Sequence, residues 1–299
     1  MPTAKVNGIN MAYDVSGQGE PLILIMGPGG TRQSWFFQKR AFSKHFKVIT
    51  FDNRGIGKSD KPDEPYTIKT LADDTIGLMN HLGIDKAHIL GVSGGGRVAQ
   101  EVAINYPQRV IKLVLASTTH GGEEEVTPEM QRVLGVTDYF SENDTLKAGM
   151  SRCPVCQIES PKKDLWEHQW AAHRQQMLEW ARHADWHTMA AQSFNKRLYK
   201  MFISPLAWLQ VKLGDTGTYV KYIEAGVGNS TLERLHLIKA PTLVIVGTED
   251  KLCPLHSSEV IAERIPSAKL VKVQGGSHAQ HVEMRGRFNK EVLDFLRCR

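Results

Sequence analysis

The sequence contains no long apolar segment, and this absence excludes several classes of protein. Its longest obvious apolar run, Leu22 to Met26, is far shorter than the roughly 20 residues that a membrane-spanning helix needs. The first residues, MPTAKVNGINMAYDVSG, lack the apolar core of a secretory signal peptide. We therefore expect a soluble, cytoplasmic protein with no transmembrane segment.

Concentrated positive charge and cysteine are also scarce. The 37 basic residues exceed the 32 acidic residues by five, and no run of Lys or Arg concentrates that excess, so we expect no binding to nucleic acid. The four cysteines, without a secretory signal, are expected to remain thiols or to bind metal. The remaining composition is that of a globular protein, and 299 residues are enough for one large domain with an insertion.

Short apolar runs alternate with longer stretches of helical spacing in two regions of the chain. Near-continuous runs of Val, Ile and Leu are typical of parallel strands that are buried on both faces. The alternation predicts an α/β fold, with a mostly parallel sheet flanked by helices. The predicted strands are Pro21–Met26, Phe46–Phe51, Ala87–Val92, Val110–Ala116, Thr242–Val246 and Lys269–Val273, and the predicted helices are Ser34–Lys44, Thr67–His81, Val98–Tyr106, His256–Ile265 and Arg287–Leu296.

The composition changes in the middle of the chain. Between about residues 119 and 239 the sequence holds five of the six tryptophans, many methionines and histidines, and few strand-like runs. This pattern indicates a mainly helical insertion that interrupts the sheet. We therefore predict a core made of residues 1–118 and 240–299, and an inserted segment of residues 119–239.

A serine among glycines follows one predicted strand. The stretch Ile89 to Arg97 reads ILGVSGGGR, in which Gly91, Ser93 and Gly95 form a Gly-x-Ser-x-Gly pattern. After a strand and before a helix, this pattern is the signature of a nucleophile elbow, a strained turn that raises the serine hydroxyl above the carboxyl edge of the sheet. A plain structural turn is the alternative, and the flanking strand and helix favour the nucleophile.

Two later loops offer the partners that a serine nucleophile needs. Serine is activated by a base, which an acid holds in place. Asp250 and His278 each follow a predicted strand, so both are expected at the same edge of the sheet as Ser93, in the chain order Ser, Asp, His. Asp250 could instead be a turn residue, with Glu249 as the acid, and His278 could be a surface histidine. The three residues taken together favour a catalytic triad.

Motifs at both ends of the chain resemble the α/β-hydrolase superfamily. The resemblance implies that Ser93 is the nucleophile, Asp250 the acid and His278 the base, with a mainly helical cap (lid) inserted after the sixth strand and no cofactor for catalysis. Within the superfamily the chain is similar to esterases and lactonases of the 3-oxoadipate enol-lactonase type. The motifs are LIMGPGG, FDNRGIGKSDKPD, LGVSGGGRVAQEVA, VGTEDKLCP and GGSHAQHVE followed by FNKEVLDFL.

The same resemblance implies an oxyanion hole, with one departure from the usual pattern. One donor is expected to be the backbone N–H of Gly94, directly after the nucleophile. The second normally comes from the residue after the glycine of the first loop, which here is Pro28 and has no N–H. Met26 stands where a histidine is usual. We expect Gly29 to donate instead, and a weaker hole or a side-chain donor are the alternatives.

These assignments predict a serine hydrolase that cleaves an ester, thioester or lactone of a small, partly apolar substrate. A carbon–carbon bond hydrolase or a cofactor-free perhydrolase could use the same triad. Ala279 follows His278 where many carbon–carbon hydrolases have tryptophan, which disfavours the first of these. A small-molecule receptor with vestigial turnover is an alternative of another class, and the intact triad argues against it.

The insertion contains a spacing that resembles a zinc site. Cys153, Cys156, His168 and His173 approximate the order of two cysteines followed by two histidines, although the middle spacing of eleven residues is one shorter than usual. Four protein ligands would make such a zinc structural. The alternative is two free cysteines near a histidine-rich helix, and the superfamily resemblance implies no zinc in residues 153–173.

An aromatic stripe in the insertion points to the substrate. Trp166 and Trp170 recur at helical spacing with other apolar residues. We expect this stripe to pack the cap against the core, with Trp166 and Trp170 also covering an apolar substrate pocket above Ser93.

Overall fold

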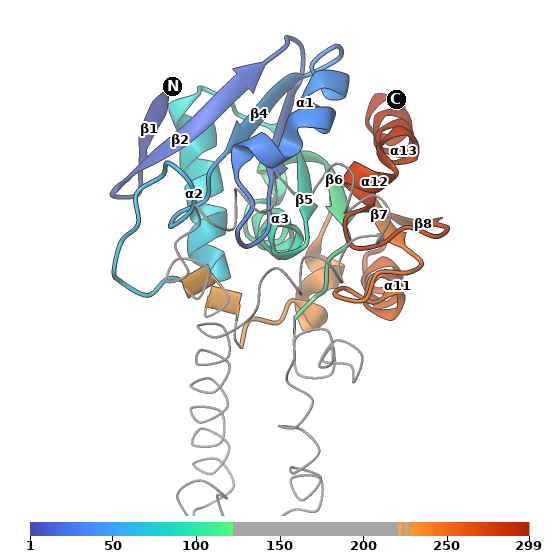
Figure 1. Ribbon diagram of the computed structural model, residues 1–299. Coiled ribbons are helices and arrows are strands. Elements are labelled where there is room, and N and C mark those ends of the chain that lie inside the picture. The colour runs from blue at the N-terminus through green and yellow to red at the C-terminus, as the bar shows by residue number, and fades with distance from the viewer. Residues whose placement is uncertain (122–220, 223–224, 227, 299) are drawn as a thin grey trace, which may run out of the picture.

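The computed structural model describes residues 1–121, 221–222, 225–226 and 228–298. An eight-stranded sheet forms its centre, with the strands in the order β1-β2-β4-β3-β5-β6-β7-β8 (Figure 1). From β4 to β8 all neighbouring strands are parallel, and β2 pairs antiparallel with both β1 and β4. The predicted α/β class with a mostly parallel sheet is confirmed.

The six predicted strands all form, and two further strands precede them. The additional pair, β1 and β2, is a hairpin that closes through Asn7 and Gly8, both with positive φ. Among the described helices, none is long and apolar enough to cross a membrane. The strands are β1 (Thr3–Val6), β2 (Ile9–Ser16), β3 (Pro21–Ile25), β4 (Lys47–Phe51), β5 (Ala87–Val92), β6 (Val110–Ala116), β7 (Thr242–Gly247) and β8 (Ala268–Val273).

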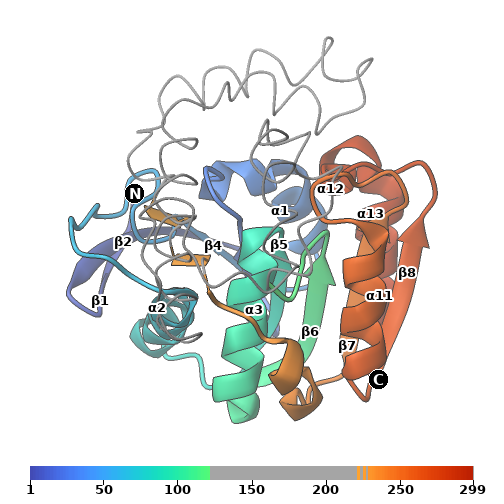
Figure 2. The ribbon, with the colours of Figure 1, turned by 90° about the horizontal axis from the view of Figure 1, so that it is seen from below.

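Helices cover both faces of the sheet. Alternate side chains of the buried strands enter two separate apolar clusters, one under α2, α3 and α11 and the other under α1 and α13. Figure 2 shows these two layers on opposite sides of the sheet. The longer helices are α1 (Phe36–Phe42), α2 (Ile68–His81), α3 (Gly94–Asn105), α11 (Leu255–Arg264) and α13 (Arg285–Arg297), and the short turns are η1 (Arg32–Trp35), η2 (Pro107–Arg109), η6 (Leu232–Leu237) and α12 (Gln280–Glu283).

The predicted insertion falls between β6 and β7, and helix α3 holds the chain where it returns. Glu101 is buried on α3 and accepts hydrogen bonds from the side chains of Asn229 and Arg234. One turn earlier, the Arg97 guanidinium donates to the carbonyl oxygen of Gly226. The division into a core and a helical cap remains a prediction, because residues 122–220 lie outside the described part.

The glycines around Ser93 allow three backbone segments to meet. A Cβ on Gly95 would overlap the carbonyl oxygen of Ile25 in β3, and a Cβ on Gly91 would overlap the backbone of Gly95 itself. The start of α3 therefore rests directly on the ends of β3 and β5. Main-chain atoms cannot move aside as a flexible side chain can, so this contact requires glycine at both positions.

We predict that Gly95→Ala destabilises the fold by about 3 kcal/mol, because the added methyl group must displace buried backbone. Gly286→Ala is the matched control, since no atom lies within 4 Å of its Cβ position near the start of α13. Alanine there should leave the free energy of unfolding unchanged or raise it by up to about 1 kcal/mol. Urea unfolding followed by circular dichroism measures both changes, and equal stability of the two variants would contradict the prediction.

Candidate active site

Ser93 lies in a strained turn between β5 and α3. Its φ of 57° and ψ of −129° are rare for a residue with a side chain, as a nucleophile elbow requires. Hydrogen bonds to β6 and to the segment that follows β6 fix the backbone of Ser93. The Ser93 N–H donates to the carbonyl oxygen of Ala116 at 3.0 Å, and the Thr118 hydroxyl donates to the Ser93 carbonyl oxygen at 2.7 Å. The serine is thus held at the carboxyl edge of the sheet.

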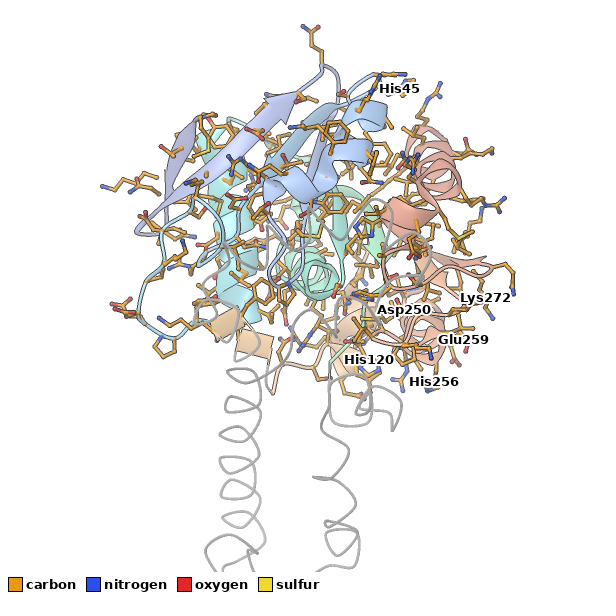
Figure 3. The ribbon with its side chains drawn as sticks, viewed as in Figure 1. His45, His120, Asp250, His256, Glu259 and Lys272 are labelled. Carbon is orange, nitrogen blue, oxygen red and sulfur yellow. The ribbon has the colours of Figure 1, made fainter. Side chains whose placement is uncertain are left out.

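Asp250 and His278 meet at the same edge. The Nδ1 atom of His278 lies 3.0 Å from each carboxylate oxygen of Asp250. The Asp250 side chain is fully buried, and its Oδ1 also accepts the backbone N–H groups of Leu252 and Cys253. Glu249, the rival acid, is exposed. Figure 3 shows Asp250 beyond the end of β7, where the parallel strands finish.

A short chain of contacts joins the histidine loop to the serine turn. The Gln280 side chain, two residues after His278, donates to the Ser117 hydroxyl at 3.0 Å and to the carbonyl oxygen of Ile245 at 3.2 Å. Ser117 directly follows the residue that holds the Ser93 N–H. In the described part of the chain, the Ser93 hydroxyl makes no hydrogen bond to His278. Such bonds are often long until substrate is bound.

The pKa values of the two neighbouring histidines, His278 and His281, are shifted in opposite directions. Burial lowers the pKa of His278, but the charge of Asp250 and its hydrogen bond outweigh burial, and the net result is a pKa above the ordinary 6.5. His281 is buried against the rings of Trp35 and Phe288, and burial together with repulsion from His278 lowers its pKa to about 3. His278 can therefore accept a proton near neutral pH, whereas His281 remains uncharged.

The first loop approaches Ser93 closely. Gly27, Pro28, Gly29 and Gly30 form a β-turn, closed by the Gly30 N–H on the Gly27 carbonyl oxygen at 3.2 Å. Gly29 has a φ of 72°, which together with Pro28 before it is typical of a type II turn. A Cβ on Gly27 would lie 3.0 Å from both the Gly94 nitrogen and the Ser93 Cβ.

Both expected donors have unused N–H groups. In the described part of the chain, neither the N–H of Gly94 nor that of Gly29 makes a hydrogen bond. Gly94 is the first residue of α3, where helix geometry leaves the N–H without an internal partner. Gly29 occupies the turn position whose N–H does not close the turn.

The charged residues after β4 stabilise the fold. Asp52 is fully buried and accepts the backbone N–H groups of Arg32 at 2.7 Å and Lys58 at 2.9 Å. Arg54 binds the buried Asp74 through two hydrogen bonds of 2.7 and 2.8 Å. Arg54 also lines an open groove of about 570 Å³ beside α2, which contains no triad residue. We assign this groove no chemistry because Asp74 already neutralises Arg54.

The residues expected to bind metal or cover the substrate lie outside the described residues. These are Cys153, Cys156, His168 and His173 for zinc, and Trp166 and Trp170 for substrate. Within the described ranges, no group of three or more His, Cys, Asp or Glu side chains is placed to hold a metal ion.

A strand–serine–helix turn and a histidine bonded to a buried aspartate, at one edge of a largely parallel sheet, are typical of one family. A sequence profile of the α/β hydrolase fold matches residues 20–284. The chain belongs to the α/β-hydrolase family. The profile begins after β2 and covers β3 to β8, including the segment between β6 and β7.

Relatives within this family carry several hydrolytic activities in their names. A protein provisionally named carbamate hydrolase RutD, from Caulobacter segnis, is 28% identical over 305 residues, with 99% of each chain covered. The crystal structure of an enol-lactonase from Burkholderia xenovorans is 25% identical and superposes with a TM-score of 0.73, covering 99% of each chain. Est816, described as an enzyme that degrades N-acyl homoserine lactones, is 25% identical with a TM-score of 0.71, covering 98% of this chain and all of that one.

We predict that the imidazole of His278 titrates above pH 6.5, whereas His281 stays neutral down to about pH 3. Asp250→Asn should lower the pKa of His278, because the charge that stabilises its protonated form is lost. NMR of protein labelled at histidine Cε1 measures both values, with His278→Gln and His281→Gln variants to assign the signals. A His278 pKa that does not respond to Asp250→Asn would show that the pair is not coupled.

Proposed function

We propose that this protein is a serine hydrolase that cleaves an ester, thioester or lactone of a small, partly apolar molecule through an acyl-enzyme on Ser93. The observation that carries the proposal is the buried Asp250 carboxylate bonded to the His278 imidazole, at the edge where the strained turn presents Ser93. A receptor would need neither the strained serine nor an aspartate bonded to a histidine. No cofactor is part of the proposed chemistry.

The first half-reaction uses all three side chains. The Ser93 oxygen attacks the substrate carbonyl carbon while His278 Nε2 takes the hydroxyl proton. The negative charge of Asp250 stabilises the imidazolium, and its bond to Nδ1 fixes the tautomer in which Nε2 is free to accept the serine proton. His278 then gives the proton to the leaving oxygen or sulfur, the carbonyl re-forms, and the acyl group remains on Ser93.

The second half-reaction releases the acid. Water gives a proton to His278 and attacks the acyl carbon, and the collapse of the tetrahedral intermediate returns a proton to Ser93. In both halves the carbonyl oxygen becomes negative, and we assign the N–H groups of Gly94 and Gly29 to stabilise it. Each such donor is typically worth about 3 kcal/mol of transition-state stabilisation.

Substrates with an internal ester fit this proposal well. The names of the enol-lactonase and of Est816 specify lactones, and the same acyl transfer opens a lactone with the alkoxide as a leaving group that stays attached. The name carbamate hydrolase specifies a carbonyl with a nitrogen substituent. We favour lactones and esters because the nitrogen lone pair of a carbamate makes its carbonyl carbon less electrophilic. A panel of p-nitrophenyl esters, lactones and carbamates compares the classes directly.

We predict that Ser93→Ala reduces ester hydrolysis by at least about 10⁴-fold while leaving the fold intact, because no other group in the site supplies the nucleophile. A fluorophosphonate probe should label the wild-type protein at Ser93, as located by peptide mass mapping, and should not label the variant. The control is the unchanged circular dichroism and melting temperature of Ser93→Ala. Full activity of that variant would refute the assignment.

We predict that kcat/KM falls as the pH drops through a value above 6.5, because the base must be neutral and the pKa of His278 is raised. Asp250→Asn should move this inflection to lower pH and reduce kcat by about 10⁴-fold. Initial rates between pH 5 and pH 9 at saturating and limiting ester give both parameters. An inflection that Asp250→Asn leaves in place would argue against His278 as the base.

A further inference from the structure

A buried tyrosine hydroxyl near the nucleophile turn is unused by the fold. Tyr222 is 2% exposed, and its hydroxyl is one of the buried polar atoms without a hydrogen-bond partner among the described residues. The hydroxyl of a buried tyrosine normally finds a partner, because leaving it unpaired destabilises the folded state. Since the Tyr222 ring lies beside Gly94, the residue after Ser93, a molecule bound at that turn is a candidate partner for the hydroxyl.

The Tyr222 ring occupies space that a side chain on Gly94 would fill. Its Cε1 atom lies 3.1 Å from the Cβ position of Gly94, and the hydroxyl oxygen is only two bonds from Cε1. The same Cβ position lies 2.7 Å from Cδ of Pro28. Glycine after the nucleophile thus allows a tyrosine and a proline to meet over the first N–H of α3.

Pro28 contributes no backbone donor to the proposed oxyanion site, which has the N–H groups of Gly94 and Gly29 from the main chain. Its Cδ is bonded to the backbone nitrogen and stands where other residues carry the N–H hydrogen. This carbon points to the start of α3, beside Gly94. A side chain from another segment can add a donor on this side, and the Tyr222 ring approaches the same position beside Gly94.

The Tyr222 hydroxyl remains a donor throughout the working range of pH. Burial raises its pKa far above the ordinary value of 10, the charge of Tyr66 adds to this, and the nearby Arg97 offsets only part of it. The neutral phenol has one O–H to donate and no charge that would have to be neutralised on binding.

We propose that the Tyr222 hydroxyl donates a hydrogen bond to the carbonyl oxygen of the bound acyl group, as a side-chain member of the oxyanion hole beside Gly94. The inference rests on the proposed acyl transfer at Ser93. No proton is transferred: the O–H bond of Tyr222 stays intact, and its hydrogen bond strengthens as negative charge develops on the oxygen. The phenol adds a third donor to the N–H groups of Gly94 and Gly29, on the side where Pro28 has no N–H.

The test is Tyr222→Phe, which keeps the ring and removes the oxygen. With p-nitrophenyl acetate and butyrate, we expect kcat to fall about 100-fold with little change in KM, as for the loss of one oxyanion donor. The melting temperature should stay equal or rise, because an unpaired buried hydroxyl is removed. A structural role would give the reverse, with a lower melting temperature and an unchanged kcat.

An inhibitor that mimics the tetrahedral intermediate distinguishes stabilisation of the transition state from binding of the ground state. An alkyl trifluoromethyl ketone forms a tetrahedral oxyanion on a serine, and its inhibition constant should weaken by the same factor as kcat/KM in Tyr222→Phe. The affinity for the product acid should stay within about twofold of wild type, because uniform binding is not altered. Equal weakening for product and ketone would overturn the proposal, since Tyr222 would then bind both states alike.

Two control variants distinguish failure of the Tyr222 proposal from failure of the proposed hydrolase function. Tyr106→Phe removes a hydroxyl that donates to Asp73 at 2.6 Å on the outer surface of α2, and it should lower stability slightly without changing kcat. Ser93→Ala reports whether Ser93 is the nucleophile at all. If Ser93→Ala abolishes turnover and Tyr222→Phe stays within twofold of wild type, the tyrosine proposal fails while the hydrolase proposal stands.

Discussion

The active-site edge depends on the close approach of backbone to backbone beneath Ser93. The positive φ of the serine requires a sharp reversal between β5 and α3, and that reversal fits only because Gly91 and Gly95 carry no side chains. The same contact places the first N–H of α3 next to the loop that follows β3. One steric constraint therefore sets the position of the nucleophile, of the helix N-terminus and of the first-loop turn together.

The pairing of Asp250 with His278 follows from the order of the strands. Strands β7 and β8 are neighbours, so the loops that follow them bring Asp250 and His278 into contact without any long side chain. A buried carboxylate would be costly alone, and here it is satisfied by the imidazole and two backbone N–H groups. The second histidine, His281, is buried against aromatic rings and stays neutral, so in the proposed mechanism the positive charge develops on His278.

The sequence predicted the sheet well because its central strands are buried on both faces and read as continuous apolar runs. The β1–β2 hairpin was missed, although Asn7 and Gly8 between alternating residues are the usual signal for its turn. The predicted helix Val98–Tyr106 starts four residues late, because three consecutive glycines argue against a helix while close packing requires them. The motifs predicted Ser93, Asp250 and His278 as a triad, which stays a prediction, and the structure places Asp250 and His278 in contact. The position of Tyr222 could not be predicted, since its proximity to Gly94 arises only from the path of the returning chain.

Helix α3 begins at the nucleophile and, within two turns, also carries the side chains that hold the returning chain at Gly226, Asn229 and Arg234. A foreign segment inserted between β6 and β7 must therefore meet one structural requirement. The graft must deliver its far end to Arg97 and Glu101, or the buried Glu101 carboxylate keeps only Asn105 as a side-chain partner, two turns from Ser93. Family members that exchange this segment are expected to keep the anchorage and vary what lies beyond it.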